Sequence, residues 1–534
     1  MSVVCWLQNS LTRVYPSTEA FSCGTPTLAA ARNERISFQA CTRNIGDNCR
    51  NIRVSVIAPD FLGITIRRVG YVPVAHFNTD TPSDELDGLG RIPGYVPDPL
   101  FHDDTAIVGP FETHSFWINI AVPEDVIPGS VEFRVVFRDG DDVVGDLTSS
   151  VVISDLVLAP RTFPVTHWFY ADALCDWYAV NAFDERFWAI VEPYMANLVS
   201  HGNNCMYVPI FTPPTDGVKR PTQLMKVSMP VKGIYNFDFT DVKRWIDLAR
   251  KCGATMFEWT HLFSQWGVKY ALRIYRDNNN DKSLLWESET GATSNVYRNF
   301  LAQFLPEFYN FLIREDLIDI SLFHVSDEPH GDEHLQNYRD ARSMLKELAP
   351  WMRVADALSD IRYGIESLTD IPIPSIAAAS EFSKAGIPAW TYFCCGPRGK
   401  YLNRFLDTPL AKIRMAGWLF YRHDAKGFLH WGYNYWYKSQ TRVLIDPFTE
   451  QCGGVWPCFG QGDPFVVYPG PNGPLDSIRW EVFAESLNDY ALLQTADISR
   501  DSELLSDIQG YDEFPKTVEW IMDARRSILG ADIE

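Results

Sequence analysis

The 534-residue chain lacks long hydrophobic runs, an excess of basic residues and any regular cysteine spacing. A membrane-spanning helix needs about 20 consecutive apolar residues. The chain has no such run, so we predict that it does not span a membrane. Lys and Arg number 47 against 68 Asp and Glu, which gives a formal net charge of −21. Such acidity argues against a nucleic acid or an anionic membrane as the partner, because both carry negative charge.

The eleven cysteines form an odd set without the CxxC spacing that is typical of metal sites. Cys394 and Cys395 are adjacent in the chain. The N-terminal segment has no basic region followed by a long apolar run, so no secretory signal is visible. We therefore predict reduced thiols in a cytoplasmic protein, with no metal and no cofactor.

With 534 residues, the chain is longer than a single hydrophobic core usually serves, so we expect two or more domains. We predict three parts. Residues 1–160 show short alternating segments and a hairpin turn at 139–142, which indicate a β-sandwich. Residues 161–475 alternate between strand-like and helix-like segments, and residues 476–534 form a C-terminal helical segment packed on that domain.

About eight β/α units in the middle part predict a (β/α)8 TIM barrel. The alternative is an open doubly wound sheet, but no glycine-rich phosphate loop follows the first strand. In the β-sandwich, residues 79–103 are polar and rich in Pro and Gly. They predict a long loop that could reach over a neighbouring active site.

Residues 316–330 begin as an apolar run and end in two adjacent acids, Asp327 and Glu328, followed by Pro329. Proline cannot extend a central strand, so the strand is expected to stop near Ser326. Both acids would then lie at the C-terminal end of a barrel strand, where such barrels carry their chemistry. The alternative is that they only cap the next helix, as Asp332 would do.

Other polar and aromatic residues are expected at the same rim of the barrel, from several strands. They are His167, Glu258, Asp356, Trp390, Tyr392, Trp431, Tyr433, Asn434 and Trp436. The tryptophans could equally be core residues, and Glu258 and Asp356 could pair with arginines. His167 and Glu258 could bind a metal, but no ligand spacing supports one.

Paired carboxylates walled by aromatic rings suit glycoside hydrolysis, in which an acid protonates the leaving oxygen. Adjacent acids suit substrate assistance better than a two-carboxylate mechanism drawn from separate strands. The 2-acetamido oxygen of the sugar would attack C1. Asp327 would hold the acetamido N–H, Glu328 would act as general acid and then base, and Tyr392 would hold the acetamido oxygen.

These motifs resemble glycoside hydrolase family 123 and its β-N-acetylgalactosaminidase-like relatives. The resemblance rests on residues 95–100, 324–329, 390–397, 427–436, 462–470 and 477–490. It implies a β-sandwich followed by a (β/α)8 barrel, no metal, and retaining exo-cleavage of β-linked N-acetylgalactosamine from a glycan.

Two alternatives stay open at this point. One is a glycosidase for another β-linked sugar, with Asp327 or Glu258 as the nucleophile. The other is a non-catalytic carbohydrate-binding barrel, or a scaffold, since a fold alone does not establish a function. The sequence also leaves open a homo-oligomer.

Overall fold

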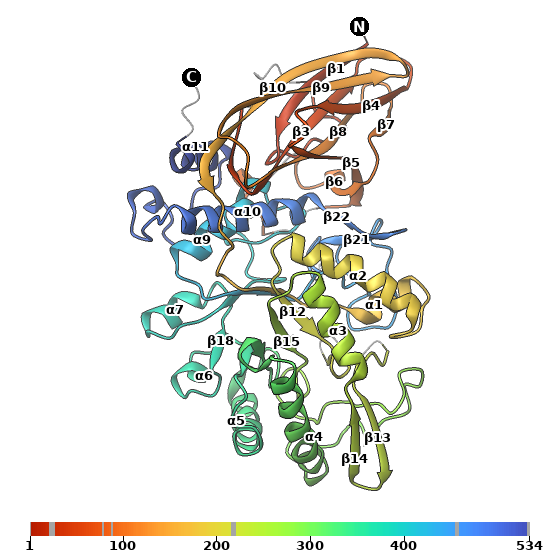
Figure 1. The fold of residues 1–534 in the computed structure, drawn as a ribbon, viewed down its shortest axis with the longest axis vertical. Coiled ribbons are helices and arrows are strands. Elements are labelled where there is room, and N and C mark those ends of the chain that lie inside the picture. The colour runs from red at the N-terminus through yellow and green to blue at the C-terminus, as the bar shows by residue number, and fades with distance from the viewer. Residues whose placement is uncertain are drawn as a thin grey trace.

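The structure is a computed structural model, and it describes residues 2–20, 27–76, 80–86, 89–214, 220–453 and 459–530. An all-β region at the N-terminus lies against a larger region of helices and a curled parallel sheet (Figure 1). The first and last elements, β1 and α11, lie at the end of the molecule that the β region forms (Figure 1).

The β region contains two five-stranded sheets, ordered β1-β3-β8-β5-β6 and β2-β10-β9-β4-β7. Their inward-facing side chains form a separate core that includes Phe38, Val54 and Phe133. The strands are β1 (Val3–Asn9), β2 (Leu28–Arg32), β3 (Glu34–Asn44), β4 (Arg50–Ile57), β5 (Gly63–Val74), β6 (Gly94–Phe101), β7 (Thr105–Val108), β8 (Thr113–Val122), β9 (Gly129–Asp139) and β10 (Asp142–Val157).

The predicted loop at 79–103 is wrong in part, because residues 94–101 form β6, which pairs with β5. Pro97 and Pro99 made a strand improbable from the sequence. They are tolerated because β6 is an edge strand, where a missing N–H leaves no ladder bond unmade. A short 3-10 helix, η1 (Ser83–Glu85), precedes it. Thr79, Asp87 and Gly88 of the predicted loop lie outside the described residues.

The second region has a six-stranded parallel sheet, ordered β16-β15-β12-β11-β20-β19, and a parallel pair, β17-β18. Isolated parallel bridges Phe323–Val354 and Ser375–Tyr392 link the pair to the two edges of the sheet. The strands of the second region are β11 (Val165–His167), β12 (Cys205–Val208), β13 (Lys226–Val231), β14 (Ile234–Asp238), β15 (Met256–Trp259), β16 (Ser321–Leu322), β17 (Ala355–Ala357), β18 (Ile371–Ile373), β19 (Thr391–Tyr392), β20 (Phe428–His430), β21 (Val467–Gly470) and β22 (Gly473–Asp476). Of these, β13 pairs with β14 and β21 with β22 in separate antiparallel hairpins.

Helices separate these parallel strands along the chain and flank the sheet (Figure 1). They are α1 (Ala171–Trp177), α2 (Glu185–Ser200), α3 (Thr240–Lys251), α4 (Asn295–Arg314), α5 (Gly331–Leu348), α6 (Arg362–Ile365), α7 (Ala379–Lys384), α8 (Leu410–Arg414), α9 (Ala416–Arg422), α10 (Ile478–Thr495) and α11 (Val518–Leu529), with 3-10 helices η2 (Ile318–Ile320) and η3 (Glu503–Leu505).

Local sequence signals account for several helix ends. Asp184 caps α2 by accepting a hydrogen bond from the Phe187 N–H at 2.8 Å, and Ser294 caps α4 in the same way. After α3, Gly253 takes a φ of 101°, which glycine adopts without steric cost.

The predicted strand at 316–326 is much shorter than expected. Asp316 turns the chain with a φ of 53°, η2 follows, and the strand proper spans only Ser321–Leu322. The apolar run therefore supplies a turn of 3-10 helix before the strand that leads to the two acids.

Helix α10 lies between the two regions and is buried along nearly its whole length (Figure 1). Arg479 on α10 pairs with Asp98 of β6 at 2.9 Å, and both side chains are fully buried. Arg67 of β5 pairs with Glu481 at 2.8 Å and also with Asp476. The contact between the regions is therefore built from buried, paired charges, each of which is costly to leave unpaired.

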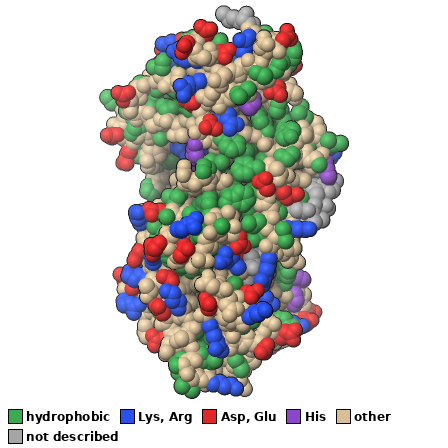
Figure 2. All heavy atoms as spheres, turned by 90° about the vertical axis from the view of Figure 1, so that its right-hand side faces the viewer, with side chains coloured by type: hydrophobic (Ala, Val, Ile, Leu, Met, Phe, Trp, Pro, Cys, Tyr) green, Lys and Arg blue, Asp and Glu red, His purple; other side chains and the backbone are tan. Residues whose placement is uncertain are grey.

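Within the described ranges, no helix combines the length and hydrophobicity needed to cross a bilayer. Figure 2 shows one face of the molecule, on which hydrophobic side chains gather across the middle and charges of both signs are mixed above and below them.

Candidate active site

Asp327 and Glu328 follow β16 in a turn that the neighbouring segments hold through backbone hydrogen bonds. The Trp266 N–H donates to the Asp327 carbonyl at 3.1 Å, and the Glu328 N–H donates to the Ala357 carbonyl at 3.0 Å. Glu328 has a φ of 43°, in the left-handed region that non-glycine residues seldom adopt. Such backbone strain clusters at functional sites.

The two acids share one cavity of about 120 Å³. It is lined by Trp168, Gln265, Trp266, Asp327, Glu328, Ala357, Tyr392, Cys394, Cys395, Leu429, Trp431 and Phe459. Four residues predicted from the sequence therefore come together here: Asp327, Glu328, Tyr392 and Trp431.

Each acid has its own polar partner in this cavity. The Gln265 amide donates to the Asp327 Oδ2 at 2.8 Å, and the Tyr392 hydroxyl donates to the Glu328 Oε1 at 2.5 Å. Asp327 is buried and Glu328 half-buried. Burial and the adjacent Glu328 carboxylate raise the pKa of Tyr392 well above its ordinary value, so the phenol stays protonated and can donate.

Aromatic rings form one wall of the cavity. Trp431 lies 4.9 Å from Phe459, ring centre to ring centre, and its indole N–H donates to the Asp463 Oδ2 at 3.0 Å. Burial raises the pKa of Asp463 well above its ordinary value. The ring faces near the acids lower the local dielectric and could stack on a sugar.

A buried network lies behind the acids and contains Glu258, His324 and Asp356. His324 contacts the Glu258 Oε1 through Nε2 at 2.8 Å and the Asp356 Oδ1 through Nδ1 at 3.1 Å. Burial alone would lower the pKa of His324, but the hydrogen bonds with the two carboxylates outweigh it and raise the pKa to about 10. The ring is therefore a buried cation between two carboxyl groups.

This network holds the strand that carries the acids. Both Asp356 oxygens accept from the Val325 N–H at 3.1 Å, and Oδ2 also accepts from the Tyr338 hydroxyl at 2.5 Å. Glu258 also accepts from the Trp168 indole at 2.8 Å and from the Thr166 hydroxyl. Glu258 is fully buried, so its oxygens are committed to the interior.

The remaining predicted site residues lie outside this cavity. His167 is buried between Asn203 and Arg404, at 3.0 and 2.7 Å, and burial and Arg404 lower its pKa well below the ordinary value. Tyr433 and Trp436 are fully buried, and Asn434 bonds the Tyr170 backbone. These residues are packed as polar and aromatic core.

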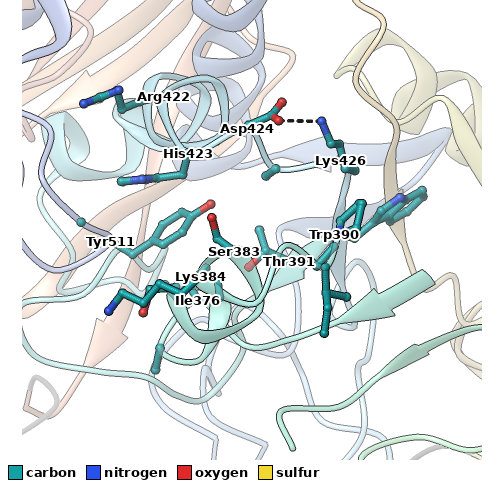
Figure 3. A pocket seen from close by; sticks show the side chains of 18 of the residues that line it. Ile376, Ser383, Lys384, Trp390, Thr391, Arg422, His423, Asp424, Lys426 and Tyr511 are labelled. Atoms are coloured by element: carbon teal, nitrogen blue, oxygen red, sulfur yellow. Dashed lines mark hydrogen bonds and ion pairs between the residues drawn. The ribbon is translucent and has the colours of Figure 1, made fainter. Parts of the chain in front are cut away.

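Trp390 lines a different and larger cavity, of about 690 Å³ (Figure 3). That cavity lies between α7, the end of α9 and residues 509–512. The Asp424–Lys426 ion pair, at 2.7 Å, is at its edge (Figure 3). The cavity with Asp327 and Glu328 has the smaller volume of these two. It is the candidate active site because it combines adjacent carboxylates, a separate donor to each and an aromatic wall.

Sequence reasoning missed Gln265, Trp266, Cys394, Cys395 and Phe459. The cysteines directly follow β19, so the strand-end argument could have identified them. Gln265, Trp266 and Phe459 come from long connections, and no periodicity predicts where such loops fold back.

Two groups among the described residues each bring three potential metal-ligating side chains together: His261, His324 and Asp356, and His201, Asp476 and Glu481. In each group, ligand atoms already take part in hydrogen bonds or ion pairs within the protein. Neither group lines the cavity with the two acids.

Comparison with known proteins identifies the class of this protein. Residues 168–496, more than half of the chain, match the model of the glycoside hydrolase 123 catalytic domain. The chain belongs to glycoside hydrolase family 123. It is therefore a glycosidase, and its substrate is a carbohydrate.

Among solved structures, the chain is similar to a family 123 glycoside hydrolase from Clostridium perfringens, studied for glycolipid glycan hydrolysis. The TM-score is 0.74 at 14% identity, with 99% of this chain and 97% of that chain covered. At this identity the similarity shows the fold alone.

Other solved structures are more distant. A Bacteroides ovatus GH5 xyloglucanase has a TM-score of 0.33 at 8% identity, and the match covers 86% of this chain and 98% of the xyloglucanase chain. A family 39 glycoside hydrolase from Bacteroides cellulosilyticus has a TM-score of 0.35 at 8% identity, covering 87% and 82%. No curated protein matches the chain.

Proposed function

We propose that this enzyme is an exo-acting, retaining glycosidase that releases β-linked N-acetylgalactosamine from a glycan, with assistance from the 2-acetamido group of the substrate. The observation that carries the proposal is the pair Asp327 and Glu328, adjacent in the chain and held in one cavity by separate partners.

In the first step, the acetamido oxygen attacks C1 while Glu328 gives a proton to the leaving glycosidic oxygen. The C1–O bond breaks and an oxazolinium forms, with Asp327 accepting the acetamido N–H and balancing its positive charge. In the second step, Glu328 takes a proton from water as the water attacks C1. Two displacements at C1 leave its configuration unchanged.

The surroundings support this division of roles. Gln265 donates to Oδ2 of Asp327 and thereby orients the carboxylate, so that it can accept the acetamido N–H. Tyr392 donates to Glu328 and lies in the same cavity, so its hydroxyl can hold either that acid or the acetamido oxygen. We assign the acetamido oxygen to Tyr392 when substrate is bound.

A glycosidase for a plain β-linked sugar, with a protein nucleophile, is the second candidate. Glu258 is a poor nucleophile, since it is fully buried and already accepts from Trp168 and His324. Asp327 would have to take that role. A non-catalytic sugar-binding barrel is disfavoured because each acid keeps a specific donor.

The architecture that carries this function is also proposed. We propose that the ring of parallel pairings through β11, β12, β15 to β20 is a (β/α)8 barrel spanning residues 161–475. The β-sandwich would then comprise residues 1–160 and the C-terminal helical segment residues 476–534. A cytoplasmic location and a homo-oligomeric state stay predictions from the sequence.

Hydrolysis of matched chromogenic substrates tests the function: β-N-acetylgalactosaminide, β-N-acetylglucosaminide and β-galactoside, each with wild type, Asp327→Asn and Glu328→Gln. We expect release from acetamido sugars only, with kcat reduced about 10²- to 10⁴-fold in Glu328→Gln. Glu333→Gln, on an exposed face of α5, is the matched control. Comparable release from the β-galactoside would contradict acetamido assistance.

A further inference from the structure

Two thiols stand side by side in the active-site cavity. The Cys394 and Cys395 sulfur atoms are 3.8 Å apart, and both residues line the cavity with Asp327 and Glu328. A disulfide would require about 2.05 Å, so the two sulfurs are separate thiols. The catalytic scheme above does not use either of them.

The sulfur separation matches a metal chelate. In a tetrahedral Zn²⁺ site with Zn–S bonds of about 2.3 Å, two neighbouring sulfurs lie about 3.8 Å apart. A thiophilic ion could therefore bind both sulfurs of this pair with little movement of either. Soft thiolate ligands select soft or borderline ions such as Zn²⁺ and Cd²⁺ over hard ions such as Mg²⁺.

The backbone of the pair is held in place. The Arg398 guanidinium donates to the Cys395 carbonyl at 2.6 Å, and the Asn403 amide donates to the Cys394 carbonyl at 2.9 Å. The dipeptide therefore does not have to be ordered when an ion binds, which reduces the entropic cost of binding.

We propose that Cys394 and Cys395 form a two-sulfur site for a thiophilic divalent cation, and that an ion bound there blocks sugar hydrolysis. Two S–H bonds break, two metal–sulfur bonds form, and two protons pass to solvent, with no change of oxidation state. The remaining coordination positions are left to water, because no third His, Cys, Asp or Glu among the described residues brings a ligand atom within 4.8 Å of both sulfurs.

Two physical consequences follow. The bound ion would occupy space and bring positive charge next to Glu328, which must give up and regain a proton. The hydrogen bond with Cys395 and burial raise the pKa of Cys394 well above its ordinary value. At neutral pH its thiol is therefore a slow nucleophile toward alkylating reagents, and a metal that binds there must displace its proton, so binding strengthens as pH rises.

The test uses Cd²⁺ as the probe on the full chain, without substrate. Thiolate-to-cadmium charge-transfer absorption is titrated in wild type, Cys394→Ser, Cys395→Ser and the control Cys49→Ser, which removes an exposed cysteine. We expect wild type and Cys49→Ser to bind one Cd²⁺ with release of two protons, and each active-site variant to lose at least tenfold in affinity. Equal binding by all four proteins would overturn the proposal.

Hydrolysis is measured separately, comparing each protein with and without Zn²⁺. We expect Zn²⁺ to lower kcat/KM at least tenfold in wild type and Cys49→Ser, but less than twofold in the active-site variants. Cd²⁺ binding without inhibition by Zn²⁺ would refute the blocking role alone. Because absorption is read without substrate, failure of the metal site is distinguishable from a wrong substrate assignment.

A second measurement covers the case in which a serine variant does not fold. Phenylarsine oxide needs two adjacent thiols, and its oxygen leaves as water when two As–S bonds form. One equivalent is expected to abolish Cd²⁺ absorption in wild type. Full Cd²⁺ absorption after that treatment would place the cadmium elsewhere and overturn the proposal.

Discussion

The Tyr392 hydroxyl donates to the Glu328 carboxylate at 2.5 Å, across 64 positions of sequence. Tyr392 ends β19, whereas Glu328 lies in the turn after β16. The curled sheet brings these two strand ends to one cavity, so the contact is a direct consequence of the topology.

Replacing Tyr392 with Phe removes this donor while keeping the ring. We expect kcat/KM for the N-acetylgalactosaminide to fall about 10- to 100-fold, because the side chain can then hold neither Glu328 nor the acetamido oxygen that the proposal assigns to Tyr392. Tyr401→Phe is the matched control, because Tyr401 lines the larger cavity. Equal effects of the two substitutions would argue against a role for the Tyr392 hydroxyl.

Gln265 is a positioning residue for Asp327, since its amide donates to Oδ2 at 2.8 Å. For Gln265→Ala we expect kcat to fall about 10- to 100-fold on acetamido sugars. If the role is orientation, the loss appears mainly in kcat, whereas a merely structural role would lower thermal stability and leave kcat of the folded fraction unchanged. Steady-state kinetics and thermal unfolding on the same preparation separate these outcomes.

The buried His324 makes stability depend on alkaline pH. Its folded-state pKa of about 10 lies above the unfolded value of about 6.5, so its contribution is fully present below pH 6.5 and is lost as pH rises through 10. We expect the free energy of unfolding to decline more steeply between pH 7 and 10 in wild type than in His324→Gln. Urea unfolding at a series of pH values measures this.

His423 provides the control for that experiment. Burial and Arg422 lower the pKa of His423 to about 4, so this ring is neutral in folded and unfolded states above pH 7. His423→Gln is therefore expected to keep the wild-type slope. Parallel slopes for wild type and His324→Gln would contradict a charged His324.

The Asp98–Arg479 pair tests the contact between the two regions. Asp98→Ala leaves a fully buried guanidinium without its carboxylate, so we expect a loss of about 3–5 kcal/mol in the free energy of unfolding. Asp104→Ala, which breaks an exposed pair with Arg53, should change it little. Replacing Asp98 and Arg479 together by apolar residues should recover most of the loss. Similar stabilities for the two single variants would show that the buried pair contributes nothing.

Local sequence features were sufficient for several conclusions. Alternating patterns and turn residues predicted the β region, and apolar runs separated by amphipathic segments predicted the parallel strands, because these periodicities reflect which face is buried. The adjacency of Asp327 and Glu328 after an apolar run identified the candidate acids. With the motifs around Trp390 and Trp431, it also indicated the family, which the comparison confirmed.

Predictions that depended on position at a strand end succeeded only in part. The same reasoning grouped Tyr392 and Trp431 with Trp390, Trp436 and Tyr433, but only the first two reach the cavity. Trp390 lies before β19, and Trp431, Tyr433 and Trp436 follow β20. The path of this irregular backbone, which strand alternation does not describe, decides whether each side chain enters the cavity or the core.

By itself, the sequence determined the acidic character of the protein, its β and β/α organisation, and the two adjacent acids, since each follows from composition or local period. Only the tertiary structure decided which groups surround those acids. Gln265, Trp266 and Phe459 reach the cavity from long connections, while Glu258, His324 and Asp356 close into a buried charge network behind it. These contacts depend on the closure of the sheet and the paths of its long loops, which no local pattern encodes.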